Sequence, residues 1–148
     1  MSHAKTFALT LAALTGPALA LALAVSHRAS SAEPAGGKRV FELRTYHTNP
    51  GKLDDLHTRF RDHTCRLFRK HGMELIGFWT PQDEKQGKGD TLVYLLAFPS
   101  RDAAKASWQA FQDDPEWKKV YQESHKNGVL VKGVESVYLD PTDYSAIR

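Results

Sequence analysis

The stretch that decides the fold is residues 101–121, RDAAKASWQAFQDDPEWKKVY. The apolar residues in its first half recur at spacings of four and three, which predicts a helix with one apolar side. These residues are Ala104, Trp108 and Phe111. Asp114-Pro115 then predicts the start of a second helix, because proline suits the first helical position. The stretch therefore predicts two consecutive helices.

The segments on either side alternate between strand and helix signals. Strands are expected at residues 40–46, 75–80, 91–98 and 134–139, and a further helix at 52–70. The resulting order, β-α-β-β-α(α)-β, predicts an α+β protein of the ferredoxin-like type. In that fold one four-stranded antiparallel sheet carries helices on one face. Residues 91–98 are apolar on both sides, which indicates a central strand covered on both faces.

The face of the sheet that the helices leave open must also be covered. The 91–98 strand is apolar throughout, and four aromatic residues of the strands add to the apolar area. These are Phe41, Trp79, Tyr94 and Tyr138. Large exposed apolar patches usually mark an interface, so we expect a homodimer that packs sheet against sheet.

The first part of the chain does not look like part of this domain. Residues 7–25 carry no charge and are rich in Ala and Leu, and small residues follow at Ser30 and Ala32. This pattern predicts a signal peptide over residues 1–32, and hence a secreted or periplasmic protein. An uncleaved membrane anchor is the alternative, since the apolar run is about long enough to span a bilayer. A mitochondrial presequence fits less well, because the segment is poor in Arg. Residues 33–39 are expected as a linker, 40–140 as the domain and 141–148 as a tail.

Charge and cysteine content exclude several classes of protein. The 148-residue chain has a formal charge of +3, and removing residues 1–32 takes away Lys5 and Arg28 and no acid, leaving +1. A nearly neutral domain gives no support for nucleic-acid binding. Cys65 is the one cysteine, so no disulfide can form within the chain. We expect it to be an inert, partly buried thiol.

Several short blocks resemble the NIPSNAP family in the order in which they occur. They are residues 41–46 (FELRTY), 50–52 (PGK), 71–72 with 75–79 (HG and LIGFW) and 114–117 (DPEW). The resemblance covers residues 40–140 and implies a dimeric α/β barrel. It supplies no reaction, because the family has no well-established one. Its animal members are mitochondrial or linked to vesicles, so their partners do not transfer to a chain with a secretory-type leader.

Candidate functional residues lie on the helix expected over 52–70. At 100° per residue, His57, Thr64 and His71 fall within ~40° of one another inside the apolar sector, and His63 lies at its edge. Polar groups on a core-facing stripe need partners, and a ligand cavity between helix and sheet would supply them. His63 and His57 are then candidate acid–base residues. The residues expected to line the cavity are His63, His71, Thr64, Trp79, Tyr94 and Trp108.

Each of these residues also has a simpler interpretation. His71 would cap the end of the helix, His57 would have a solvent-exposed tip, and the aromatic residues would belong to the core and the interface. Arg59, Arg66 and Lys70 form a basic stripe beside the histidines, which is most often a solvated face and less often an anion site. No pair of helix histidines has the spacing of metal ligands, and the sequence implies no metal and no cofactor.

Two functions from different classes remain open. The first is an exported, homodimeric NIPSNAP-like module that binds a small molecule or a protein without catalysis. The second is a small monooxygenase-like enzyme, haem-dependent or cofactor-independent, that uses the cavity beside the helix. Related barrel families include such enzymes, and His63 or His57 would serve as the acid–base residue.

Overall fold

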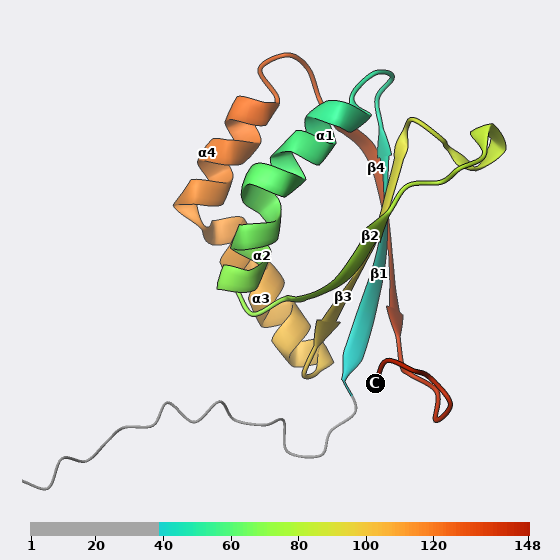
Figure 1. The fold of residues 1–148 in the computed structure, drawn as a ribbon. Helices are drawn as coiled ribbons and strands as arrows, with labels where there is room; N and C mark the ends of the chain where they lie inside the picture. The colour runs from blue at the N-terminus through green and yellow to red at the C-terminus, as the bar shows by residue number, and fades with distance from the viewer. Residues whose placement is uncertain (1–38) are drawn as a thin grey trace, which may run out of the picture. The chain divides into compact units, whose positions relative to one another are not determined.

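The computed structural model describes residues 39–148, and four strands form one antiparallel sheet in the order β2-β3-β1-β4 (Figure 1). The strands are β1 (Val40–Thr48), β2 (Glu74–Trp79), β3 (Thr91–Phe98) and β4 (Val131–Leu139). This is the predicted ferredoxin-like fold. β4 begins three residues earlier than expected, because the C-terminal end of β1 offers it backbone partners. Gly133 lies opposite His47, and Val131 lies opposite Thr48.

The helices all lie on one side of the sheet (Figure 1). They are α1 (Leu53–Arg59), the π-helical turn η1 (Phe60–Thr64), α2 (Cys65–Lys70), α3 (Arg101–Asp113) and α4 (Pro115–Ser124). A short 3₁₀ turn, η2 (Glu84–Gln86), lies in the loop between β2 and β3. Ser100 caps α3 through a hydrogen bond to the Ala103 N–H, and Asp114 caps α4 through the Glu116 N–H. Both caps satisfy N–H groups that a helix start leaves without partners.

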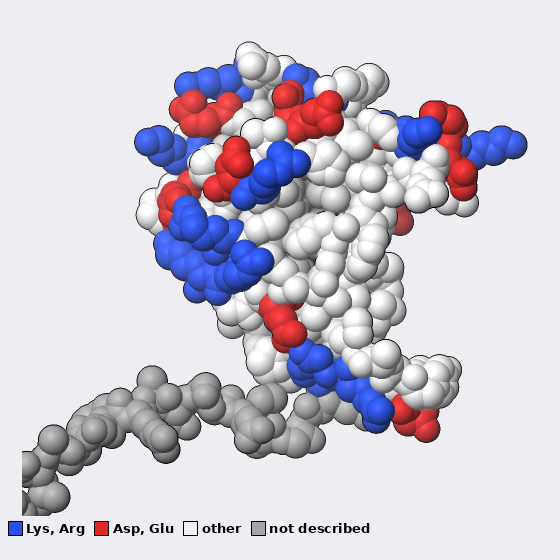
Figure 2. Space-filling model, viewed as in Figure 1, with Lys and Arg blue, Asp and Glu red and all other residues white. Residues whose placement is uncertain are grey.

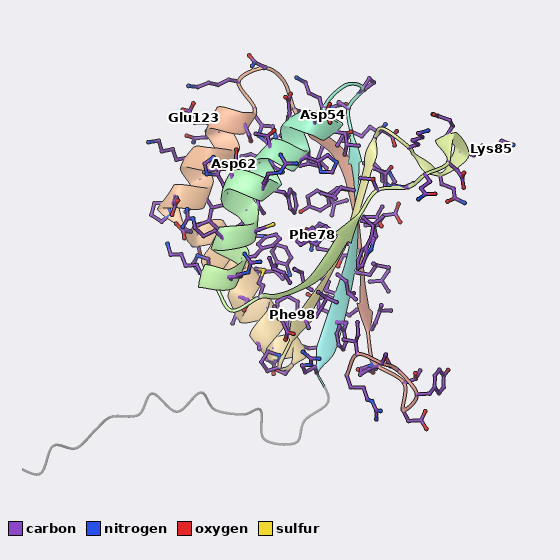
Figure 3. All side chains as sticks on the ribbon, viewed as in Figure 1. Asp54, Asp62, Phe78, Lys85, Phe98 and Glu123 are labelled. Atoms are coloured by element: carbon purple, nitrogen blue, oxygen red, sulfur yellow. The ribbon has the colours of Figure 1, made fainter. Side chains whose placement is uncertain are left out.

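Aromatic rings fill the space between the sheet and the first helical segment. The Tyr94 ring lies on β3 with its centre 5.3–6.0 Å from four others, those of Tyr46, Phe60, Phe68 and Phe78. Figure 3 shows Phe78 and Phe98 pointing from the sheet toward the helices. The contacts to Tyr46 and Phe60 are edge-to-face and that to Phe78 is stacked, and such ring pairs stabilise a core beyond the area that they bury.

The helix expected over residues 52–70 is continuous but is not α-helical throughout. In η1 the Cys65 N–H donates to the Phe60 carbonyl, five residues back, and the Thr64 hydroxyl donates to the Arg59 carbonyl over 3.2 Å. Such a turn holds one residue more than an α-helical turn. It therefore rotates the side chains that follow by ~100° from where an α-helical wheel puts them.

β1 turns its polar side, and not its apolar side, toward the helices. Glu42 and Arg44 lie opposite Leu96 and Tyr94 of the core, and residues opposite one another share a face of the sheet. Glu42 is 1% exposed. Alternation predicted the strand correctly, but the helices cover the face with the charged residues.

The other face of the sheet has no helix over it within residues 39–148 (Figure 1). The side chains of this open face include Leu43, Val93, Leu95, Val137 and Leu139. Trp79 is 54% exposed, and a Cβ on Gly77 would lie 2.5 Å from its ring, so glycine is needed for this close approach. Of the aromatic residues expected on this face, Tyr94 and Tyr138 lie instead on the helical side, in register with Arg44 and Glu42.

The C-terminal tail lies against one end of the open face. Ile147 and Pro141 line a cavity of about 400 Å³ together with Phe41, Leu95 and Leu139. Arg39 Nε donates to the Arg148 carbonyl over 2.6 Å. The tail thus covers part of the apolar surface that the sheet alone would expose.

Charged side chains are unevenly distributed over the surface. Figure 2 shows them gathered over the helices and on the loop that carries η2, with uncharged surface along the sheet between them. The predicted signal peptide and most of the predicted linker lie outside the described residues. Within the described part of the chain, no helix is both long enough and apolar enough to cross a membrane.

Candidate functional site

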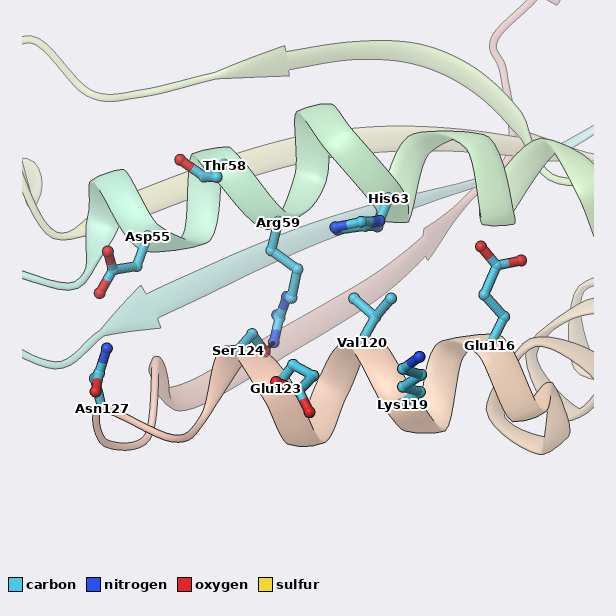
Figure 4. Close-up of a pocket in the computed structure, with 10 residues that line it drawn as sticks. All are labelled: Asp55, Thr58, Arg59, His63, Glu116, Lys119, Val120, Glu123, Ser124 and Asn127. Carbon is cyan, nitrogen blue, oxygen red and sulfur yellow. Dashed lines mark hydrogen bonds between the residues drawn. The ribbon is translucent and has the colours of Figure 1, made fainter.

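A groove of about 540 Å³ runs between the first helical segment and α4 (Figure 4). α4 packs beside α1 and η1, so the two walls of the groove come from parts of the chain that are far apart in sequence. The residues that line it are Asp55, Thr58, Arg59, His63, Glu116, Lys119, Val120, Glu123, Ser124 and Asn127.

Arg59 is the buried cation of this groove. Its side chain crosses from α1 toward α4, and its Nη1 donates to the Ser124 hydroxyl over 3.3 Å (Figure 4). Its guanidinium lies 5.3 Å from the centre of the Trp117 ring and 5.9 Å from that of Tyr121. The residue is 5% exposed, and its Nε has no hydrogen-bond partner. Burial lowers the pKa of Arg59 from its ordinary value.

The carboxylates of the groove are already paired with cations other than Arg59. Asp55 accepts from Lys52 over 3.0 Å, and Glu123 pairs with Lys126 over 2.5 Å. Glu116 pairs with Arg66. Among residues 39–148, no carboxylate lies within ion-pair distance of Arg59. The groove therefore contains a buried positive charge without a counter-charge.

A second polar cluster lies between the sheet and α3, around Glu42. The carboxylate accepts from Arg44 Nη1 and the Ser136 hydroxyl, each over 2.6 Å, and from Trp108 Nε1 over 2.5 Å. Because three donors satisfy this buried carboxylate, the cluster has the character of a structural network.

Two further buried polar atoms lack partners, Arg44 Nε and Tyr94 Oη. Burial raises the pKa of Tyr94 well above its ordinary value. The Arg44 guanidinium lies 5.6 Å from the centre of the Tyr46 ring. The interior between helices and sheet thus contains polar atoms without hydrogen-bond partners.

The structure does not bring the six predicted cavity residues together. His63 lines the groove between η1 and α4. His57 lies beside a different, shallow groove with Trp79 and Arg61. Six residues already place His57 and His63 about 120° apart on an α-helical wheel, so His63 lies toward α4 while His57 faces the β2 edge of the sheet.

The other predicted residues have structural roles. Thr64 is buried and bonded to the Arg59 carbonyl, Trp108 donates to Glu42, and Tyr94 is at the centre of the aromatic core. His71 stands at the C-cap of α2, and its Nε2 lies 2.7 Å from Asp114 Oδ2. The simpler interpretation of His71 as a helix cap agrees with this position.

Sequence reasoning missed the buried charge of Arg59. It grouped Arg59 with Arg66 and Lys70 as a solvated stripe, whereas only Arg66 and Lys70 are exposed. No cluster of three or more His, Cys, Asp or Glu able to hold a metal ion occurs in the described part of the chain.

Comparison with known families decides the relationship. The family model described as NIPSNAP matches residues 41–146. The chain belongs to the NIPSNAP family. The match takes in the sheet except for Val40, together with the groove and most of the tail.

Solved NIPSNAP structures share this fold. A NIPSNAP family protein of unknown function from Agrobacterium tumefaciens has a TM-score of 0.66 and 20% identity, with 76% of this chain and 96% of that one covered. An uncharacterized NIPSNAP domain protein from Burkholderia xenovorans has a TM-score of 0.61 and 22% identity, covering 72% and 97%. At such identities the likeness shows the fold alone. No curated protein matches the chain.

Proposed function

We propose that this NIPSNAP domain is a homodimeric module that binds a small molecule in the groove between η1 and α4. The unpaired, buried guanidinium of Arg59 is the observation that carries the proposal, because a buried charge without a partner is costly unless something binds it. The groove volume of about 540 Å³ also falls in the usual range of small-molecule sites.

The homodimer is proposed from the open face of the sheet. Val137 and Leu139 on β4 are 52% and 40% exposed, and Trp79 lies on the same face. The tail covers only one end of this surface. A second copy that packed its open face here would bury the remaining apolar side chains of both subunits.

The binding proposal is tested by retention of a ligand. The purified full-length protein is incubated with a metabolite mixture, desalted and analysed by native mass spectrometry. Val120→Trp fills the groove and should abolish retention, while Lys118→Trp, two residues away on α4 and outside the groove, should not. Equal retention by the wild type and Val120→Trp would contradict the site, and no retention by the wild type would contradict binding.

Catalysis in the same groove is the second candidate, because His63 lines it. A monooxygenase would consume oxygen with a quinol-like or haem substrate, and a haem-dependent one would carry haem colour when purified. Activity that His63→Ala abolishes without loss of ligand retention would favour the enzyme. Ligand retention with no oxygen consumption by the wild type would favour the module.

We also propose that the protein is exported from the cytoplasm. The uncharged run over residues 7–25 and the small residues before position 33 support a signal peptide. We expect the mature chain to begin after Ala32. The intact mass of protein recovered from the medium or the periplasm tests this expectation, and a full-length mass in the membrane fraction would favour the retained anchor.

A further inference from the structure

We infer that the ligand of the groove is a small organic monoanion that places its carboxylate against the guanidinium of Arg59. This inference rests on the binding function proposed above and adds the chemical class of the ligand.

The charges of the helix–sheet interior support an anion. Arg59 is buried there and Arg44 is partly buried, with a side chain 17% exposed, and Glu42 is the carboxylate buried with them. Glu42 is committed to Arg44, Trp108 and Ser136. Arg59 has the Ser124 hydroxyl and two aromatic rings as neighbours. One positive charge is therefore left for a ligand to balance.

The shape of the free donors favours a carboxylate. A guanidinium presents parallel N–H groups that match the two oxygens of a carboxylate, and such bidentate pairs are stronger than bonds between neutral groups. The Arg59 Nε–H has no partner, and it belongs to a side chain that is 5% exposed and reaches into the groove (Figure 4). The N–H parallel to Nε–H belongs to Nη2, so a carboxylate that binds side-on leaves the Nη1 hydrogen bond to Ser124 in place.

The walls of the groove favour a single negative charge. Asp55, Glu116 and Glu123 line the groove, and although each is paired, their negative charge disfavours a doubly charged phosphate more than a singly charged carboxylate. Val120 offers apolar surface to the rest of the ligand, and Asn127 and Thr58 offer it hydrogen bonds. A carboxylate with a short uncharged body fits these walls best.

The experiment compares matched probes with the full-length protein. Acetate, hexanoate, benzoate and phenylacetate are titrated beside their primary amides and inorganic phosphate, with binding followed by calorimetry and thermal shift. We expect at least one acid to bind ten times more tightly than its amide. Arg59→Gln should lose that preference, while Arg61→Gln, an exposed arginine two residues away and outside this groove, should keep it.

Several outcomes would overturn the inference. These are equal binding of acids and amides, binding of phosphate in place of the acids, and full acid affinity in Arg59→Gln. Where Arg59→Gln does not fold, Arg59→Lys is used instead, because it keeps the charge but loses the planar guanidinium. Unchanged affinity of Arg59→Lys for the acid would also overturn the inference. A neutral or cationic molecule retained from the metabolite mixture would end this inference but leave the proposed function standing, whereas no retention at all would end both.

A stability measurement separates a binding role from a structural one. If Arg59 serves a ligand, the free protein gains little from it, and Arg59→Met should unfold at a midpoint equal to or above that of the wild type. A benzoate or phenylacetate that binds should raise the wild-type midpoint and leave that of Arg59→Met unchanged. A lower midpoint for Arg59→Met together with no ligand-dependent shift in the wild type would mean that Arg59 is structural.

Discussion

Glu42 and Arg59 show how differently two buried charged residues can be used within one small domain. Glu42 is surrounded by donors from β1, α3 and β4, which ties the sheet to α3. Arg59 has rings and one hydroxyl around it and no carboxylate. The first arrangement stabilises the free protein, and the second leaves a donor for a ligand.

Removal of the Glu42 carboxylate should strongly destabilise the domain. Glu42→Ala leaves the partly buried Arg44 without its counter-charge, and we expect a loss of about 3 kcal/mol in the free energy of unfolding. Glu74→Ala is the control, because Glu74 forms an exposed pair with Arg39 and should cost about 1 kcal/mol or less. Urea denaturation measures both, and similar losses in the two variants would contradict the network.

Asp114 should make stability depend on acid pH. Hydrogen bonds from Lys70 and His71 hold the pKa of Asp114 well below its usual range. A carboxyl with a depressed pKa stabilises the fold above its unfolded pKa of about 3.9, and that contribution is lost as the pH falls toward the folded pKa. The deficit of Asp114→Asn relative to the wild type should therefore be complete above about pH 5 and shrink below about pH 4.

A second variant separates the charge of Asp114 from its capping role. Asn keeps the N-cap bond to the Glu116 N–H, whereas Ala loses it. Asp114→Ala should thus be less stable than Asp114→Asn at every pH. Chemical denaturation between pH 3 and pH 8 measures these differences, and a pH-independent deficit in Asp114→Asn would contradict the role of the charge.

At the scale of elements, η1 is the feature that positions the groove. Hydrophobic spacing correctly predicted a helix over residues 52–70. A helical wheel assumes 100° per residue throughout, so it cannot detect a single π-helical turn. The wheel therefore placed His57 and Thr64 on one side. In the structure Thr64 is buried and bonded to the Arg59 carbonyl, while His57 lies by Trp79. The sequence also could not show which face of β1 the helices cover, because the pattern FELRTY alternates in the same way in either case.

Deletion of one exposed residue of η1 tests its function. Without Asp62, the segment should return to α-helical bonding with α1 and α2 in their present orientation, since a π turn holds one extra residue. We expect a folded protein by circular dichroism and a thermal midpoint within about 8 °C of the wild type, the shift that about 1 kcal/mol produces. Ligand retention should fall at least tenfold, and undiminished retention would show that η1 does not position the site.

At the scale of the whole molecule, the order of strands and helices was sufficient to predict the sheet topology. The ferredoxin-like arrangement follows from how β-α-β units pack, and it needs no detail of side chains. The fold of the tail onto Phe41 and Leu139 could not be predicted, because residues 141–148 have no periodicity. The open face that remains is the basis of the proposed dimer.

The dimer is tested by two matched substitutions on β4. Val137 and Val134 are 52% and 48% exposed, but Val137 lies on the open face opposite Leu43, whereas Val134 lies on the helical side opposite Tyr46. Val137→Glu should convert a dimer into a monomer in sedimentation velocity at micromolar concentration, and Val134→Glu should not. A wild-type protein that sediments as a monomer would contradict the dimer directly.

The most direct measurement of the central claim is the NMR signal of the Arg59 Nε–H during a titration with benzoate and phenylacetate. This proton has no hydrogen-bond partner in the free protein, so a carboxylate that reaches it should move its resonance strongly downfield and in a saturable way. The Arg61 Nε–H serves as the internal reference and should not move. An Arg59 signal that stays in place while a carboxylate binds elsewhere on the protein would contradict the account.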